Sequence, residues 1–219
     1  MCANYTPTPP DRLRAFFDVL TAFRLDYVDD AYPGHVAPIV VGEAGTRSAE
    51  LAVFGLIPPW SRDGRNFRQC YNARSETVAE KPSFRHAWKA RQWCVVPADA
   101  FYEPSYESGK AVRWRIEDAN GDPLAIAGIH ERWRAPSGET IASFSMLTIN
   151  ADAHPVMSRF HAPGDEKRSV VLLERERIDE WLNASEQEAR ALIRAFVPER
   201  VRTVAAPRPR RGKGSAEGS

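Results

Sequence analysis

The sequence predicts an α+β fold with a mostly antiparallel, barrel-like β-sheet core and flanking helices. Short apolar or alternating segments, each typical of a strand, follow one another through the middle of the chain. Helical patterns concentrate near the two ends, so strands and helices do not alternate as they do in a parallel βαβ fold. In addition, 17 prolines and few amphipathic stretches exclude a helical bundle.

The first element is expected to be a helix that starts at Thr8. Thr8 is a typical N-cap, a proline follows at the first helical position, and Asp11 stands in the first turn. Apolar residues then recur at helical spacing from Leu13 through Leu20 to Phe23.

Strands and three further helices are expected after this helix. The strand patterns cover 39–41, 51–54, 93–97, 112–116, 124–129, 144–149, 170–173 and 201–205. Helices are predicted over 83–91, 178–182 and 185–196, the last with a capping box formed by Ser185 and Glu188. Between Pro58 and Arg74 no periodicity is present, so a long irregular loop is expected there.

Composition predicts one domain over residues 2–206 and a disordered basic tail over 207–219. The chain has 219 residues, 43% hydrophobic and 27% charged, which suits one soluble domain. The tail carries four Arg and Lys residues against one Glu, a net charge of +3, whereas the whole chain has a net charge of +1. A nucleic-acid surface on the domain must therefore be a local patch.

Cysteine usage and hydropathy indicate the compartment. Three cysteines without CxxC spacing do not form a disulfide framework, and they favour a reducing cytoplasm. No apolar run resembles a signal peptide or a membrane span. CxxC, HExxH and close His pairs are also absent, so neither a metal nor another cofactor is expected.

Met1-Cys2 is the first stretch that can carry chemistry. A Cys after the initiator Met is small enough for the Met to be removed, which leaves an α-amine and a thiol on adjacent carbons. An α-amine titrates near 7.7–8.0, so part of it is neutral and nucleophilic at physiological pH. Aldehydes are the natural targets, because the amine forms an imine on which the thiol closes a five-membered ring. The alternative is that Cys2 is only a small residue at the start of the chain.

The segment from Trp60 to Arg74 interleaves arginines with aromatic residues. Trp60 offers a face on which bases stack, and Arg62, Arg68 and Arg74 can pair with phosphates. This combination suits single-stranded nucleic acid, which exposes both bases and phosphates. A solvated loop with a few anchoring aromatics has the same composition.

Three further polar residues could assist chemistry. Asn72 can hold a hydroxyl or a carbonyl in place. Glu103 follows two aromatics where the strand from Trp93 is expected to end, and desolvation there would raise its pKa toward that of a general acid–base. His161 is expected in a loop, and histidine is the side chain best suited to shuttle protons at physiological pH. Each also has an ordinary interpretation, as a turn residue, a strand-end carboxylate and a surface histidine.

Several motifs together resemble the SRAP family (SOS response-associated peptidase), which comprises abasic-site processing proteins. The resemblance runs from Cys2 to about Ala205 and rests on motifs that occur in the family's order. They are Met1-Cys2, Phe54-Gly-Leu-Ile-Pro-Pro-Trp60, Asn72-Ala-Arg74-Ser-Glu76-Thr77, Cys94 to Glu103, Ala127-Gly-Ile129, and His161 followed by Arg168 and a hydrophobic strand.

The resemblance implies a role for each matched residue. Cys2 would lose Met1, attack the aldehyde of an abasic site in single-stranded DNA through its amine, and close a thiazolidine with its thiol. Glu103 would transfer protons, and His161 would assist ring opening and imine chemistry. Asn72 would position the N-terminus. Arg74 would hold a phosphate, with Trp60 as an aromatic surface at the bend of the strand.

The resemblance also implies an enzyme of the DNA damage response with two associated activities. One is a peptidase activity that removes the protein's own N-terminal residue, and the other is AP-lyase chemistry from the imine. The expected partner is single-stranded DNA with abasic sites, not a membrane. A cytoplasmic monomer that joins the nucleoid on DNA follows from this interpretation.

Three positions depart from the family pattern. After Cys2 the family continues Gly-Arg, whereas this chain has Ala3-Asn4, so a phosphate-pairing Arg is missing beside the nucleophile. Pro104 replaces a Trp after Glu103, and an insertion over 162–167 separates His161 from Arg168.

Two other functions use the same residues. A cysteine peptidase acting on protein substrates would employ Cys2 with His161 or Glu103, but it also needs an oxyanion hole. A non-covalent binder of single-stranded DNA needs only the basic, aromatic loop, and its binding would weaken with salt.

Overall fold

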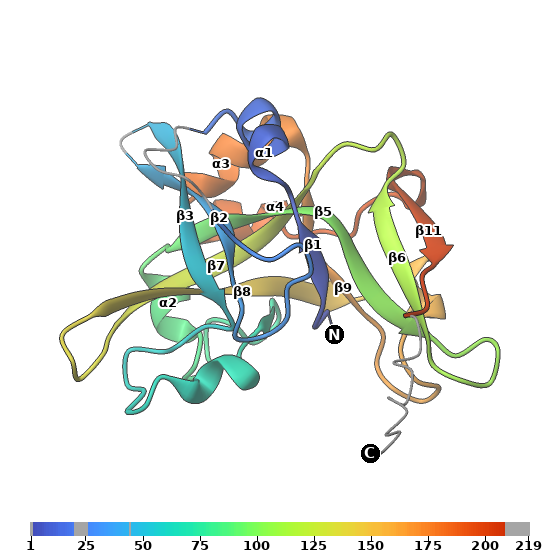
Figure 1. Cartoon of the computed structure of the whole chain (residues 1–219), viewed down its shortest axis with the longest axis horizontal. Coiled ribbons are helices and arrows are strands. Elements are labelled where there is room, and N and C mark those ends of the chain that lie inside the picture. The colour runs from blue at the N-terminus through green and yellow to red at the C-terminus, as the bar shows by residue number, and fades with distance from the viewer. Residues whose placement is uncertain (1, 20–25, 44, 209–219) are drawn as a thin grey trace, which may run out of the picture.

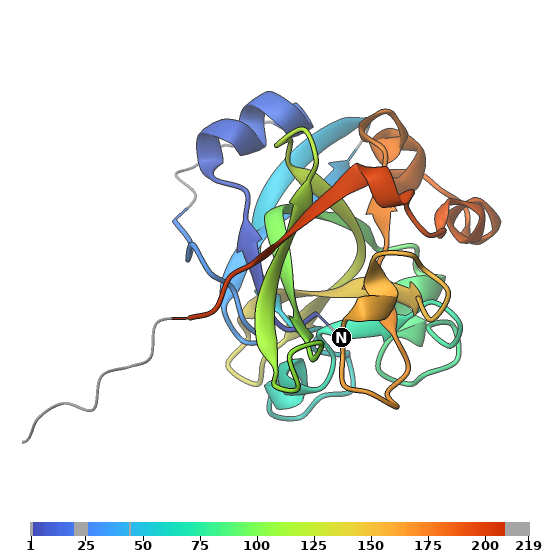
Figure 2. The same cartoon turned by 90° about the vertical axis from the view of Figure 1, so that its right-hand side faces the viewer.

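The computed structural model of the chain describes residues 2–19, 26–43 and 45–208 (Figure 1). Its centre is a closed five-stranded barrel, visible as a ring in Figure 2. The ring consists of β2 (Val36–Glu43), β3 (Thr46–Phe54), β5 (Trp93–Ser105), β7 (Leu124–Arg134) and β8 (Thr140–Asn150). Most pairings are antiparallel, and the pairing of β5 with β7 closes the barrel. The predicted α+β class with a barrel-like sheet is confirmed.

Six shorter strands extend the barrel. They are β1 (Tyr5–Pro7), β4 (Asn72–Arg74), β6 (Val112–Asp118), β9 (Arg168–Val170), β10 (Leu172–Leu173) and β11 (Val201–Ala205). Each strand predicted from the sequence is present, although the segment 170–173 is divided between β9 and β10. Strands β1 and β4 were not predicted, because three residues are too few to show an alternating pattern.

Alternation along β5 separates two apolar cores. Cys94 and Val96 point into the barrel interior, where they pack with residues such as Ile126 and Phe144. Trp93 and Val95 belong to the other core, which lies between the sheet and the helices. Successive strand residues face opposite sides of the sheet, so one strand serves both cores. Cys94 is fully buried in this apolar strand, the usual environment of an unreactive cysteine.

Short helices cover the outer core. They are α1 (Pro10–Phe17), α2 (Arg85–Lys89), α3 (Ile178–Leu182) and α4 (Glu186–Leu192). The indole of Trp181 in α3 donates to the Cys94 carbonyl over 2.9 Å, which fixes α3 on the outer side of β5. Single turns of 3₁₀ helix occur as η1 (Arg65–Arg68), η2 (Met157–Arg159), η3 (Arg175–Arg177) and η4 (Pro198–Arg200).

The helix boundaries correct two predictions. Pro9, not Thr8, is the N-cap of α1, and no side chain caps it. The helix ends at Phe17 because Asp18 adopts a left-handed conformation with φ 51°. Leu20 and Phe23, which extend the predicted helix, lie outside the described residues. The capping box of Ser185 and Glu188 is confirmed, but α4 ends at Leu192 rather than Phe196.

Two predictions around the site residues are also corrected. Glu103 does not follow the end of a strand, because β5 continues to Ser105. The irregular stretch predicted up to Arg74 ends earlier, because Asn72–Arg74 forms β4, and it contains the 3₁₀ turn η1. We call residues 58–71 the basic loop.

The basic loop is held against the barrel at Gly55. This glycine has φ +113°, and a Cβ there would lie 2.2 Å from the backbone oxygen of Phe67 in η1. Any side chain at this position would therefore push the loop away from β3.

We expect Gly55→Ala to lower the free energy of unfolding by at least about 2 kcal/mol, because it adds backbone strain and a backbone clash. Urea denaturation measures the change. Gly138→Ala is the matched control: Gly138 has φ +90°, but no atom lies within 4 Å of the place that a Cβ would take. That variant should lose only about 1 kcal/mol, and equal losses in the two variants would contradict this account of the loop.

Candidate active site at the N-terminus

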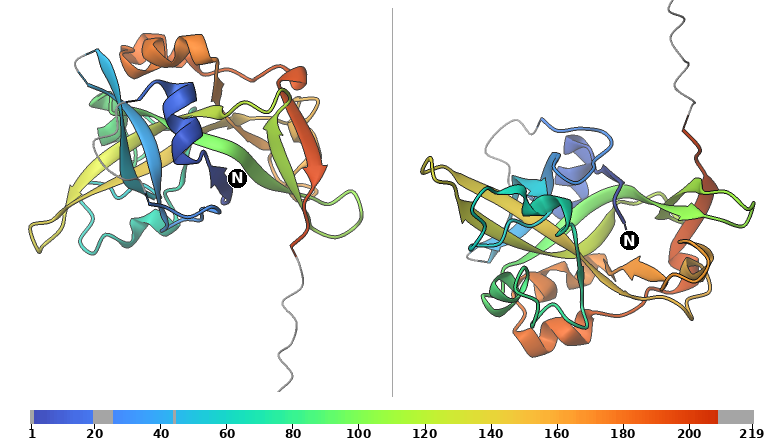
Figure 3. Two further views of the ribbon diagram at one scale, coloured as in Figure 1. Left: turned by 45° about the horizontal axis from the view of Figure 1, so that its top comes forward. Right: turned by 90° about the horizontal axis from the view of Figure 1, so that it is seen from below.

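Strand pairing carries the start of the chain to the second half of β5. β1 runs antiparallel to β5 with Tyr5 opposite Phe101, and the amide of Tyr102 donates to the Asn4 carbonyl over 3.0 Å. The chain before Asn4 therefore runs toward Glu103, and Cys2 becomes 1% exposed at the edge of the barrel interior. Figure 3 shows the N-terminal end beside β5 in two views.

Asn72 fixes the backbone of Cys2 from a distant part of the chain. β4 pairs in parallel with β8, Asn72 being opposite Met146, and this places the Asn72 side chain in a buried position. Its Nδ2 donates to the Cys2 carbonyl over 2.7 Å. Its Oδ1 is buried and has no hydrogen-bond partner within the described residues, so the site contains an unused acceptor beside Cys2.

Glu103 and His161 form a second, buried pair at the same place. Nε2 of His161 lies 3.2 Å from Oε2 of Glu103, and the two side chains are only 8% and 2% exposed. The amide of His161 donates to the Pro104 carbonyl over 2.8 Å, so the loop is tied to the end of β5. His161 also has φ 68°, a conformation that costs a non-glycine residue about 1–3 kcal/mol and that clusters at functional sites.

The thiol of Cys2 is protonated at neutral pH. Burial, and next the negative charge of Glu103, raise the pKa of Cys2 to about 12. The thiol lies 3.5 Å from the Asn4 carbonyl, to which it donates. This environment is the reverse of that of a catalytic thiolate, whose pKa is lowered by nearby cations.

Arg74 lies on the same side of β4 as Asn72, two residues further on, and is half exposed. Its guanidinium pairs over 2.7 Å with Glu166, which belongs to the 162–167 insertion. Glu166 also accepts from Arg168 over 2.8 Å. The Arg74 guanidinium, predicted to hold a phosphate, therefore forms an ion pair with a carboxylate of the insertion.

Arg168 is the buried centre of this charge network, and its role was not predicted from the sequence. Only 2% exposed, it donates to both carboxylate oxygens of Glu76 over 2.9 and 2.8 Å and to the Thr148 carbonyl over 2.8 Å. Glu76, which the sequence places near Arg74, pairs with Arg168 instead. The sequence feature that could have indicated this role is that Arg168 is the single charged residue at the start of the otherwise mostly apolar segment 168–173.

The exposed part of the basic loop, from Trp60 to Arg68, lies apart from this cluster. Tyr71 at the end of the loop is close to it, since burial, and next the charges of Cys2 and Glu103, raise the pKa of Tyr71. Trp60 is 55% exposed, and its indole donates to the Pro82 carbonyl over 3.0 Å. Arg62 and Arg68 are exposed, and in the described part of the chain neither forms an ion pair or a hydrogen bond with a carboxylate. Residues 59–91 hold eight Arg and Lys residues against three acidic residues, a net charge of +5.

The predicted site residues thus fall into two groups. The structure brings Cys2, Asn72, Glu103 and His161 together, with Arg74 beside them. Trp60, Arg62 and Arg68 form a separate exposed surface. Within residues 2–19, 26–43 and 45–208 no group of three or more metal-binding side chains is present, and no described helix is long and apolar enough to cross a membrane.

Comparisons with known proteins agree on one family. The family model described as SOS response associated peptidase (SRAP) matches residues 1–207. Abasic site processing protein YoqW of Bacillus subtilis is 30% identical over 193 residues, which cover 84% of this chain and 80% of that protein. Abasic site processing protein HMCES of Mus musculus is 28% identical over 172 residues, 64% of this chain and 47% of that protein.

Two solved structures share the fold. A crystal structure of a protein from Bordetella bronchiseptica has a TM-score of 0.87 and 35% identity, covering 94% of this chain and 99% of its own. A second, from Bacteroides thetaiotaomicron, has a TM-score of 0.80 and 22% identity, covering 93% of this chain and 91% of its own.

We expect Arg168→Gln to lower the free energy of unfolding by about 2 kcal/mol at pH 7, because the variant loses charged hydrogen bonds to Glu76 and leaves the buried Thr148 carbonyl without its donor. At Glu166 the hydrogen bond from Arg168 lowers the pKa; at Glu76 burial raises the pKa, but the bond and charge of Arg168 outweigh burial and lower it. A carboxyl group whose pKa is lowered in the folded state stabilises the fold at pH values above its ordinary pKa of 4.5. This stabilisation is lost as the pH falls through the lowered pKa.

Urea denaturation at pH 7 and at pH 3 measures this effect. The difference between wild type and Arg168→Gln should shrink at pH 3. Arg190→Gln, which removes an exposed pair with Glu186 on α4, should cost less than about 1 kcal/mol. A difference that grows on acidification would contradict the assigned network.

Proposed function

Because the chain belongs to the SRAP (SOS response associated peptidase) family, we propose that it processes abasic sites in single-stranded DNA by crosslinking to them through Cys2. The names of its relatives, which are abasic site processing proteins, support the substrate. The observation that carries the proposal is the convergence of four groups suited to aldehyde chemistry: Cys2, Asn72, Glu103 and His161.

The reaction starts with removal of Met1, the step to which we assign the peptidase activity. The freed α-amine, with an ordinary pKa near 8, attacks the aldehyde carbon of the ring-opened abasic sugar. A C–N bond forms, and one amine proton moves to the aldehyde oxygen to give a carbinolamine. A second proton then lets this hydroxyl leave as water, and the nitrogen loses its remaining extra proton to give the imine. The buried pair of Glu103 and His161 supplies the proton for the departing water and accepts the proton that the amine loses.

The thiol acts second. It adds to the imine carbon, a C–S bond forms, and the thiol proton moves to the nitrogen, which closes a thiazolidine. The complete reaction joins aldehyde and aminothiol with loss of one water. If the ring did not close, the imine would leave the sugar open to elimination of the 3′ phosphate, which is AP-lyase chemistry.

The pKa of the thiol supports this order. With its pKa raised to about 12, the Cys2 thiol is almost entirely protonated at pH 7. A cysteine peptidase attacks with the thiolate and needs a pKa far below the ordinary value. The buried Cys2 therefore favours amine-first aldehyde chemistry over peptidase activity on protein substrates. Non-covalent binding of single-stranded DNA is distinguished by experiment.

Asn72 can position both the Cys2 amine and the opened abasic sugar. Its bond to the Cys2 carbonyl over 2.7 Å limits where the amine can point. Its unused Oδ1 can accept a hydrogen bond from the amine or from a hydroxyl of the opened sugar. Since the acceptor is buried, a substrate group that satisfies it gains the full strength of that bond.

Positively charged side chains of the basic loop would guide DNA to the site. The exposed arginines of the basic loop can pair with the strand, and Trp60 offers a stacking surface. Arg74 can bind the phosphate next to the lesion once it exchanges Glu166 for that phosphate. Glu166 thus competes with DNA for Arg74.

The central test is Cys2→Ala with an oligonucleotide that contains one abasic site. Wild type should give a band on a denaturing gel that survives heat and detergent, and Cys2→Ala should give none. The Cys2→Ala chain still offers an α-amine, so borohydride should trap its imine. A heat-stable product of wild-type yield from Cys2→Ala would refute the mechanism, and salt-sensitive binding without any covalent product from wild type would support a non-covalent binder.

Glu103→Gln separates chemistry from binding. Loss of a general acid–base should slow crosslinking by at least about 100-fold, while the Kd for single-stranded DNA should change little. Single-turnover crosslinking rates and fluorescence anisotropy give the two quantities. Equal losses in rate and affinity would make Glu103 a positioning residue.

Glu166→Gln should free Arg74 for DNA. Because a half-exposed ion pair contributes up to about 1 kcal/mol, the Kd should fall by about two- to fivefold. Glu180→Gln is the control, since it removes the same charge from α3, where Glu180 pairs with Arg177. An unchanged or weaker Kd for Glu166→Gln would show that Arg74 does not bind the strand.

A further inference from the structure

A hollow of about 600 Å³ opens next to the N-terminus, on the flank away from the basic loop. Its wall includes Ala3, Asn4, Tyr102, Glu103, Arg113 and Arg208. In Figure 1 the N-terminal end lies between the basic loop, in teal at the lower left, and the strands β6 and β11 on the right. No residue of β4 or of the basic loop lines the hollow.

Arg113 of β6 is fixed in this hollow without losing its charge. Its guanidinium lies 3.3 Å from the ring centroid of Tyr102. Its Nε and Nη2 donate to the Asn4 Oδ1 over 2.9 and 2.7 Å. Because an amide oxygen is neutral, these bonds orient the guanidinium but do not themselves neutralise its positive charge.

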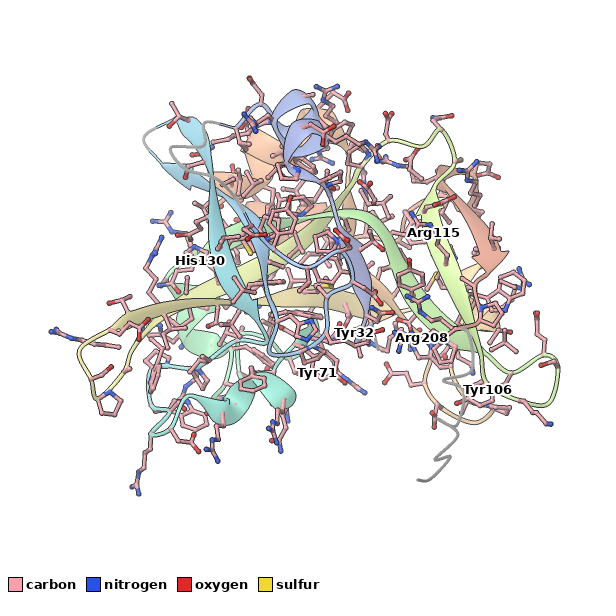
Figure 4. All side chains as sticks on the ribbon, in the orientation of Figure 1. Tyr32, Tyr71, Tyr106, Arg115, His130 and Arg208 are labelled. Atoms are coloured by element: carbon pink, nitrogen blue, oxygen red, sulfur yellow. The ribbon has the colours of Figure 1, made fainter. Side chains whose placement is uncertain are left out.

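Arg208 brings a second guanidinium to the same point. It donates to the same Asn4 oxygen over 3.3 Å and lies 4.9 Å from the ring centroid of Tyr32. Figure 4 shows the two labelled side chains, Tyr32 and Arg208, close together. Its side chain is 53% exposed, so it can turn toward a ligand at the mouth of the hollow.

Among the described residues, Asp30 is the carboxylate that pairs with both guanidiniums, and it pairs with them poorly. Asp30 lies 3.4 Å from Arg113 and 3.5 Å from Arg208, beyond the 2.7–2.9 Å of strong charge-assisted bonds. Its oxygens already accept from the Asn4 amide over 2.5 Å and from the Tyr32 hydroxyl over 3.1 Å. Two guanidiniums thus share one carboxylate that is 44% exposed and already accepts two other hydrogen bonds. Arg113 and Arg208 can therefore still bind a more strongly charged anion.

We propose that this hollow binds a phosphodiester of the nucleotide that flanks the abasic site on the side away from Arg74. The inference rests on the proposed function and deepens it. A strand bound at Cys2 must continue on both sides of the lesion, and the basic loop with Arg74 serves only one of them. Arg113 and Arg208 provide a planar, fixed donor and an adjustable one for the phosphate oxygens.

Glu103, in the wall of the hollow, sets a limit on where the phosphate lies. Its carboxylate is 2% exposed and faces His161, so the phosphate must stay at the outer, arginine side of the hollow. The abasic sugar then lies at the inner side, near Cys2. In this arrangement the phosphate does not contact the Glu103 carboxylate, whereas the aldehyde of the abasic sugar lies close to it.

The test compares abasic oligonucleotides in which one phosphate beside the lesion, 5′ or 3′, is a neutral methylphosphonate. Each replacement removes a phosphate charge that an arginine is proposed to bind, so both should slow wild-type crosslinking at limiting DNA. The replacement at the hollow should slow it by about tenfold or more, the effect of losing a charged hydrogen bond. In Arg208→Gln, and in Arg208→Gln combined with Arg113→Gln, the same replacement should have little further effect. Arg202→Gln, on β11 and 58% exposed, is the control and should respond as wild type.

Arg113 also anchors Asn4, so its variant can fail to fold; Arg208→Gln alone then decides, because its side chain is largely exposed. Equal responses of wild type and Arg208→Gln to both replacements, with crosslinking intact, would overturn this inference and leave the proposed function standing. If wild type forms no crosslink, the proposed function fails, and anisotropy with intact single-stranded DNA becomes the test. In that case unweakened binding by Arg208→Gln would overturn the phosphate site.

Discussion

The pairing of β1 with the second half of β5 is the constraint on which the site depends. A chain terminus normally frays, and a reactive group on its first residues would have no fixed position. Here the backbone bond from Tyr102 to Asn4, and the Asn72 side chain on the Cys2 carbonyl, hold the start of the chain in place. The same contacts bury Cys2 and raise the pKa of its thiol to about 12. Burial thus fixes the position of Cys2 but disfavours its thiolate form. An α-amine is partly neutral near pH 8 without assistance, so it can act as the nucleophile in a position where the thiol stays protonated.

Charge is arranged around this point in a way that the net value of +1 conceals. The basic loop has exposed arginines without carboxylate partners among the described residues, whereas Arg74 and Arg168 are neutralised by Glu76 and Glu166. On the opposite flank, Arg113 and Arg208 share the partly engaged Asp30. Under the proposed function, an incoming strand would meet uncompensated charge at the periphery and would displace carboxylates only next to the lesion. This gradient would favour binding before reaction.

Local patterns predict much of the fold. Alternation and apolar runs locate each long strand, because burial on one face of a sheet leaves a period of two in the sequence. The predicted extent of α1 and length of β5 were wrong, since a left-handed Asp18 and the tertiary pairings of β1 and β6 decide them. The resemblance to a family selected Cys2, Asn72, Glu103 and His161, but not their contacts. Those contacts join residues about 60 to 70 positions apart, and no local pattern encodes them. Ala3-Asn4 indicated a lost phosphate contact, and only the fold reveals Arg113 beside it.

The claim that the α-amine and the thiol of Cys2 both bond to the sugar is tested most directly by mass spectrometry of the digested crosslink. If both groups bond to the sugar, the N-terminal peptide should lack Met1 and carry the sugar remnant with loss of one water. The Cys2 thiol should also resist alkylation after denaturation, because the sulfur is part of a ring. An adduct on a lysine, retention of Met1 in the crosslinked peptide, or an alkylated Cys2 beside an occupied amine would each contradict this claim.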